Sequence, residues 1–167
     1  MANEAPVVNW SEADPDVARF VLEQAELHIQ SQLQCALASD QRATTLSGIL
    51  SSVSAAIFAG LAALWDKLAN DAFSAGFATA SLLLIAAAFG AWAARPIDFF
   101  VPGSRPEQFY GALRLSRAEL AGYIAENLQH DIDENERFMS GNQSAIRLGL
   151  IAALLSPVVG VTVWVLA

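Results

Sequence analysis

Three long stretches of the chain contain no charged residue. They cover residues 43–65, 72–94 and 148–167. A helix needs about 20 apolar residues to cross the hydrocarbon core of a bilayer, and each stretch is long enough. Only residues 66–71 separate the first two stretches, so we expect these two to form a helical hairpin. A buried helix of a soluble protein is the alternative for each, but so short a chain has too little polar surface to cover three of them.

The polar segment before the first stretch has the periodicity of a helix. Asp14, Pro15 and Asp16 are typical of a helix start, with a capping acid, a proline in the first turn and a second acid. Apolar residues then recur at helical spacing, at Val17, Val21, Ala25, Ile29, Leu33 and Ala36. No proline or glycine follows before Gly48, so one helix is predicted from about residue 15 into the first stretch.

A second polar helix is predicted before the last stretch. Ser104, Pro106 and Glu107 form a capping box with a proline near its start. The apolar stripe that follows consists of Leu113, Leu120, Ile124, Leu128 and Ile132. Gly141 and Asn142 then predict a break before the third stretch.

The segment between the hairpin and this helix, residues 95–106, reads RPIDFFVPGSRP. Its three prolines exclude a helix. Phe99, Phe100 and Val101 are suited to the membrane interface, and the segment either leaves the membrane or lies along it. The pattern as a whole predicts an all-α membrane protein with three transmembrane helices and long cytoplasmic amphipathic helices. Its parts are residues 1–42, the hairpin 43–94, the cytoplasmic region 95–147 and the third span 148–167.

Composition agrees with a membrane protein, because 54% of the residues are hydrophobic and only 16% are charged.

Basic residues lie mostly at one end of the three spans, at Arg42, Arg95 and Arg147, whereas Lys67 is the only basic residue at the other end. The positive-inside rule therefore predicts a cytoplasmic N-terminus and an outer C-terminus at Ala167. The first forty residues lack the features of a secretory signal, so the first span is expected to direct insertion. Tryptophans fall near the predicted interfaces, at Trp65, Trp92 and Trp164.

The net charge of −8 is unevenly distributed. Residues 1–42 hold seven acids and two Arg, whereas residues 95–147 hold eight acids and six Arg. An anionic ligand is therefore disfavoured near the N-terminus and less so in the second region. Tyr110, Arg114 and Arg117 would share one helical face there, and guanidinium groups beside an aromatic ring suit a nucleotide or oligonucleotide. Salt bridges to nearby acids are the simpler explanation of the same residues.

Residues suited to catalysis or metal binding are few. His28 and His130 lack the spacing of a metal site, and Cys35 is the only cysteine. The acids at 131–136 resemble part of a calcium loop but lack its glycine and its last glutamate. No nucleophile stands beside a base and no phosphate-binding motif occurs, so we expect neither an enzyme nor a cofactor.

Hydroxyl side chains line one side of the first span, at Thr44, Ser47, Ser51 and Ser54. If copies of this span surround an axis, these four side chains are expected to line an uncharged pore. Hydrogen bonds to the same helix or to a neighbouring one explain them equally well. No span contains an ionisable residue, which disfavours a proton relay.

Small residues form a seam on every span, and such seams let helices pack closely. The three seams are Ser52, Ala56 and Gly60; Ala86, Gly90 and Ala94; and Ala152, Ser156 and Gly160. One protomer offers more seams than it can fill, so a homo-oligomer is predicted, and a tetramer is one candidate.

The layout resembles that of small bacterial membrane effectors of antiphage defence, such as SLATT-like proteins and the effector of the Hailong system. The resemblance covers the whole chain in layout and depends on residues 95–106. It implies an ion channel in the inner membrane, gated by a nucleotide or oligonucleotide that a partner nucleotidyltransferase makes. The hydroxyl stripe would then be the pore, and residues 95–147 the sensor. A non-conducting membrane adaptor that binds a cytoplasmic protein is the alternative function.

Overall fold

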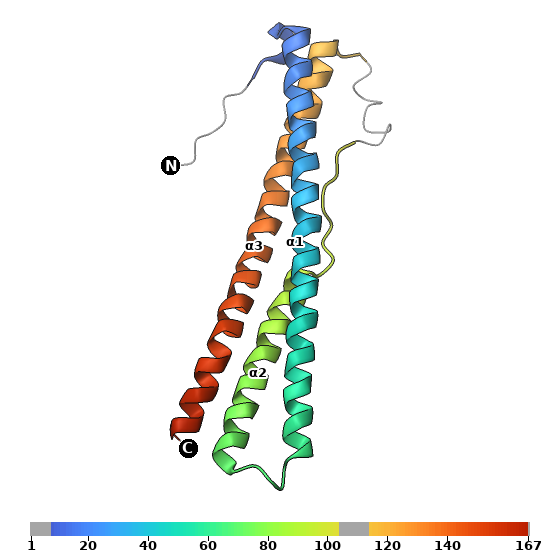
Figure 1. Ribbon diagram of the computed structural model, residues 1–167. Helices are drawn as coiled ribbons and strands as arrows, with labels where there is room; N and C mark the ends of the chain where they lie inside the picture. Colours follow the sequence, from blue (N-terminus) through green and yellow to red (C-terminus); the bar gives the residue numbers. More distant parts are fainter. Residues whose placement is uncertain (1–7, 104–113, 167) are drawn as a thin grey trace. The chain divides into compact units, whose positions relative to one another are not determined.

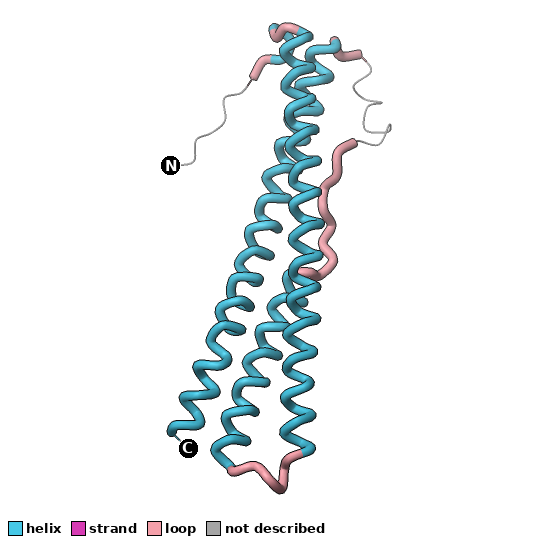
Figure 2. Tube along the Cα trace, viewed as in Figure 1, coloured by secondary structure: helices cyan, strands magenta, loops and turns pink. Residues whose placement is uncertain are grey.

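The protein is all-helical in the computed structural model, which describes residues 8–103 and 114–166. A short 3₁₀ helix, η1 (Trp10–Glu12), precedes three long α-helices: α1 (Pro15–Ala63), α2 (Asn70–Ala93) and α3 (Arg117–Leu166). No strand occurs in these described ranges, and loops join the helices (Figure 2). All three helices are long and apolar enough to cross a membrane. The predicted all-α fold with three candidate transmembrane helices is therefore confirmed.

The start of α1 is as predicted. The side chain of Asp14 accepts a hydrogen bond from the backbone N–H of Asp16 at 2.8 Å, and Pro15 is the first helical residue. This cap satisfies one of the backbone donors that a helix start leaves unpaired. From there α1 continues without interruption to Ala63, as the absence of a helix breaker predicted.

Contacts divide the chain into two units. Unit 1 is drawn from residues 1–35 and 98–137, and unit 2 from residues 36–97 and 138–167. In unit 1 the first part of α1 packs against the first part of α3. Ala18 packs with Ala118 and Ala121, and Ile29 packs with Leu128 and Ile132. Because the contacts advance in the same order along both segments, these segments run parallel (Figure 1).

The buried face of α1 in unit 1 agrees with the predicted stripe only in part. Ile29 is fully buried as predicted and Ala25 packs beside it, whereas Val17 and Val21 are exposed and Ala18 is buried in their place. The predicted stripe advanced mostly in steps of four residues, which drift around a helix of 3.6 residues per turn. The observed face alternates steps of three and four, which keeps it toward one partner helix.

Two predictions about α3 are wrong. Residues 114–116 are not helical, so a helix that starts at residue 104 does not continue into α3. Ser104, Pro106 and Glu107 themselves lie outside the described residues. Gly141 and Asn142 are inside α3 and do not break it. A glycine costs a helix only about 1 kcal/mol relative to alanine, and the helical residues on both sides outweigh this cost.

Trp10 fixes η1 to α3 within unit 1. Its indole N–H donates to the carboxylate of Glu126 at 2.8 Å, and its ring lies against the backbone at Gly122. A side chain at position 122 would overlap the ring. Only glycine therefore leaves room for Trp10 at this position.

Gly122→Ala is expected to displace Trp10 and to lower the stability of η1 by about 1–2 kcal/mol, because the ring contact and the hydrogen bond are both lost. Amide hydrogen exchange over residues 10–13 measures the effect. Gly141→Ala is the matched control, since a Cβ at position 141 meets no atom within 4 Å. Unchanged protection of residues 10–13 in Gly122→Ala would contradict this role of Trp10.

Unit 2 holds the three most apolar helical segments. Alanines that meet closely form its buried cluster, from Ala43 of α1, Ala93 of α2 and Ala145 of α3. Aromatic rings add contacts between α1 and α2, with Phe58 and Phe77 centred 5.5 Å apart. Large apolar side chains cover the outside of the unit, including Ile49, Leu84, Ile85, Leu154 and Val161. Water is a poor solvent for such a surface, which is suited to lipid.

Candidate functional site

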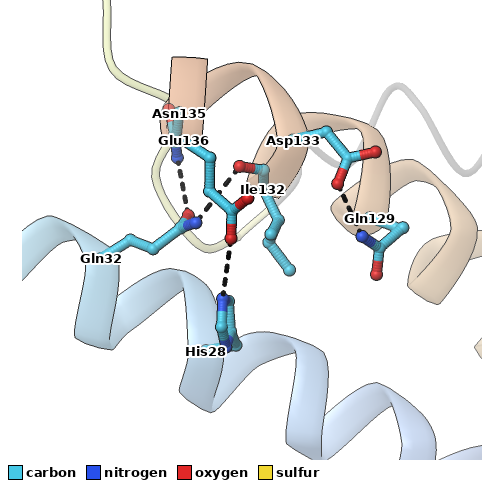
Figure 3. A network of polar contacts seen from close by, with 7 residues as sticks. All are labelled: His28, Gln32, Gln129, Ile132, Asp133, Asn135 and Glu136. Carbon is cyan, nitrogen blue, oxygen red and sulfur yellow. Dashed lines mark hydrogen bonds and ion pairs between the residues drawn. The ribbon is translucent and has the colours of Figure 1, made fainter. Parts of the chain in front are cut away.

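A buried polar cluster joins α1, α3 and the segment after α2 within unit 1 (Figure 3). Asn135 is fully buried at its centre. Its side chain pairs with both backbone groups of Phe100, accepting from the N–H and donating to the carbonyl, each at 3.0 Å. The Asn135 side-chain NH₂ also lies 3.4 Å from the side-chain oxygen of Gln32, and the side-chain NH₂ of Gln32 donates to the backbone carbonyl of Ile132 at 3.2 Å. Every polar group named here has a partner.

The cluster fixes how three segments meet. A buried amide in a parallel helix pair favours the one register in which it finds its partner. Asn135 also fixes the extended segment at Phe100, which leads from α2 back to unit 1. Sequence analysis missed this cluster, although Gln32 and Asn135 continue the three-and-four spacing of the buried positions before them.

A histidine and a carboxylate lie beside the cluster on the surface. The Nε2 of His28 on α1 and the carboxylate of Glu136 on α3 are 3.9 Å apart, and both side chains are more than half exposed. Gln129 donates to Asp133 along the outer side of α3 at 2.8 Å. Solvent weakens such exposed contacts, so they add little to stability.

The predicted ligand residues are only partly described. Tyr110 lies outside the described residues. Arg114 precedes α3 and Arg117 is its first residue, and both side chains are exposed. Because residues 114–116 are not helical, Arg114 and Arg117 do not share a helical face as predicted. They nevertheless lie at a helix start, where backbone N–H groups and the helix dipole attract anions.

A capping box that sequence analysis overlooked defines this helix start. The carboxylate of Glu119 accepts from the N–H of Ser116 at 2.8 Å, and the Ser116 hydroxyl accepts from the N–H of Glu119 at 3.3 Å. The hydrogen bonds from the backbone and side chain of Ser116 lower the pKa of Glu119. The signal was present in the sequence as a serine followed three residues later by a glutamate.

The predicted pore residues occupy different surroundings within unit 2. Ser54 is 1% exposed and donates to the carbonyl of Ala80 at 2.8 Å, and Ser47 donates to the carbonyl of Ala87 at the same distance. Both hydroxyls are thus bonded to α2 of the same chain. Thr44 is exposed and Ser51 is half-buried. The alternative interpretation, a hydrogen bond to a neighbouring helix, therefore holds for Ser47 and Ser54.

A second polar contact joins α2 and α3 in unit 2. Thr79 donates to the carbonyl of Ala75 at 2.9 Å and lies 3.4 Å from the carbonyl oxygen of Ser156. Ser156 also donates to the carbonyl of Ala153 at 2.9 Å. Pro157 lacks the N–H that would normally bond to this carbonyl, so the Ser156 hydroxyl replaces it.

The seams of α2 and α3 are filled within unit 2. A Cβ at Gly90 would lie 3.2 Å from the carbonyl oxygen of Ala43, and one at Gly149 would lie 3.0 Å from that of Ala86. A Cβ at Gly160 would overlap the hydroxyl of Thr79. These glycines therefore lie against neighbouring helices.

The seam of α1 is different. Ser52 and Ala56 are exposed, and a Cβ at Gly48 or Gly60 would meet no atom within 4 Å. With Thr44, these residues repeat at intervals of four along the helix. We call them the free seam: Thr44, Gly48, Ser52, Ala56 and Gly60.

Groups that bind metals do not gather in the part of the chain that the structure describes, where no three His, Cys, Asp or Glu side chains are placed to hold a metal ion. Cys35 is exposed.

No family model, curated protein or solved structure matches the chain. The resemblance to antiphage effectors thus stays a prediction from the layout.

Proposed function

We propose that the chain is the protomer of a homo-oligomeric pore in the inner membrane of a bacterium, acting as an effector of antiphage defence. The free seam of α1 is the observation that carries the proposal. Small residues let transmembrane helices approach closely, and these positions, which wind partly around α1, are exposed or open among the residues that the structure describes. Copies of α1 around a common axis would cover it.

The predicted orientation follows the positive-inside rule, with unit 1 in the cytoplasm and the C-terminus outside. Thr44 belongs to the free seam, and Ser51 lies about two turns of the helix after Thr44. These two side chains are the remaining polar candidates for a pore lining, since Ser47 and Ser54 are bonded to α2. A nucleotide or oligonucleotide signal would reach Tyr110, Arg114 and Arg117 and change the state of the pore through unit 1.

A non-conducting adaptor is the second candidate function. The bonds of Ser47 and Ser54 to α2 favour it, because they remove two of four hydroxyls from any lumen. In this case the spans anchor the protein, and unit 1 binds a cytoplasmic protein.

Ala56→Leu is expected to convert the oligomer to smaller species and to remove its conductance, because the added side chain prevents close approach of neighbouring α1 helices. We expect the apparent association to weaken about tenfold or more, which is roughly 1.4 kcal/mol. Native mass spectrometry of the detergent-solubilised protein measures the assembly. Planar bilayers measure conductance, with and without a cyclic dinucleotide or a short oligonucleotide.

Ala88→Leu is the matched control, since Ala88 is an exposed alanine of α2 outside the free seam. It should retain both assembly and conductance. Ser51→Leu should leave assembly intact and lower conductance. A monomeric wild-type protein would rule out the proposed pore, whereas an oligomer without conductance under every condition would favour the adaptor.

A further inference from the structure

One face of α1 in unit 1 carries exposed apolar and uncharged polar residues and faces away from α3. The residues on it repeat at steps of three and four, and all are exposed: Val17, Phe20, Gln24, Leu27, Ser31 and Gln34. We call this set the outer stripe. Phe20 is 60% exposed and Leu27 is 57% exposed, although both are large and apolar. No member of the stripe is charged.

The outer stripe has the spacing of a coiled-coil seam. Val17, Gln24 and Ser31 take one of its two repeating positions, and Phe20, Leu27 and Gln34 take the other. A seam of this kind packs against another helix with the same spacing. Within unit 1, α3 already covers the opposite face of α1, through Ala18 and Ile29.

Charges beside the outer stripe distinguish between possible partners. Asp16 and Glu23 lie along one edge, and Val21, His28 and Cys35 lie along the other. Two parallel copies would bring Glu23 of one opposite His28 of the other, and Asp16 opposite Val21. Two antiparallel copies would bring the acidic edges together, where like charges repel. The acidic edges therefore disfavour the antiparallel arrangement, in which only Glu23 is partly neutralised, by Arg19 of its own helix at 2.9 Å.

Membrane insertion imposes the same direction. Copies of one membrane protein share one orientation, so neighbouring α1 helices in an oligomer run parallel. We propose that the outer stripe is the surface by which unit 1 meets unit 1 of a second copy, in parallel and in register. This inference rests on the homo-oligomer of the proposed function. The polar members Gln24, Ser31 and Gln34 make the contact weaker than an all-apolar seam, which suits an assembly that changes state.

Cysteine cross-linking in the full-length protein tests the contact. In a Cys35→Ser background, Phe20→Cys or Leu27→Cys is expected to form disulfide-linked dimers at least about tenfold faster than a control, because the parallel seam places equal residues side by side. Asn127→Cys is the matched control, an exposed residue on α3 of the same unit. Equal cross-linking at Asn127 would overturn the proposal.

A second variant separates this contact from the oligomer itself. Leu27→Asp places one carboxylate from each copy in the seam and should lower cross-linking at Phe20→Cys about tenfold, whereas Asn127→Asp should not. If the protein is oligomeric by mass but Phe20 and Leu27 do not cross-link, the outer stripe is not the contact and the proposed function stands. A monomer by mass without cross-links would overturn both. Cross-links of Leu27→Cys only to a different protein would also overturn this inference.

Discussion

Asn135→Ala is expected to destabilise unit 1 by about 3 kcal/mol, the largest effect that we expect of any polar side chain in the unit. The substitution removes the partner of the Phe100 N–H, the Phe100 carbonyl and the Gln32 side chain at once. Since Asn135 is fully buried, water cannot replace these bonds without entering the helix pair.

Hydrogen exchange at the Phe100 amide should show the loss directly. Its protection should fall roughly 100-fold, as expected when about 3 kcal/mol is removed from the state that protects it. Gln32→Ala should have a smaller effect, about 1 kcal/mol, because the Ile132 carbonyl that loses the bond to Gln32 can still accept a hydrogen bond within helix α3. Gln129→Ala, an exposed amide on the same helix, is the control and should change little. Equal effects of Asn135→Ala and Gln129→Ala would show that the cluster does not hold unit 1 together.

The Asn135 cluster also bears on how a signal would act. Phe100 belongs to the segment that follows α2 in the chain, and Asn135 is the group that fixes it to α3. A ligand or partner that separates Asn135 from Phe100 would release this segment. Under the proposed function, the contact between Asn135 and Phe100 would be present in one state of the protein and absent in the other.

The helices were largely predictable, and so was part of the faces that they bury, since Ile29, Leu128 and Ile132 belong to the predicted stripes. Absence of charge marked the three apolar segments, and Asp14 with Pro15 marked the start of α1. The rest of the contact face in unit 1 consists of alanines such as Ala18 and Ala121, which carry little hydrophobic signal. They are buried because small side chains let the two helices approach closely.

The hydroxyl residues of the first span show a second limit of prediction from residue spacing. Spacing placed Ser47 and Ser54 on one side of the first span, and this is where the structure has them. Spacing does not tell whether that side meets another copy, water or α2, and here it meets α2. By contrast, Ser52, Ala56 and Gly60 of the free seam were predicted as a seam, but only the structure distinguishes them from the two seams that are filled.

Gly149→Leu is expected to destabilise unit 2 by about 3 kcal/mol or more. Even a Cβ at this position would lie 3.0 Å from the carbonyl oxygen of Ala86 and 3.2 Å from the Cβ of Phe89. These atoms belong to the backbone of α2 or are attached to it, so they cannot move aside without moving the helix. Unfolding in mixed SDS micelles measures the change.

Gly141→Leu on the same helix should shift stability in the opposite direction, because a Cβ there meets nothing within 4 Å and leucine favours a helix by up to about 1 kcal/mol over glycine. Equal shifts of the two variants would show that α3 does not pack on α2 through Gly149. Gly149→Leu also leaves the free seam of α1 unchanged. If the oligomer is formed by α1, this variant should therefore retain the mass of the oligomer, whereas Ala56→Leu should lose it.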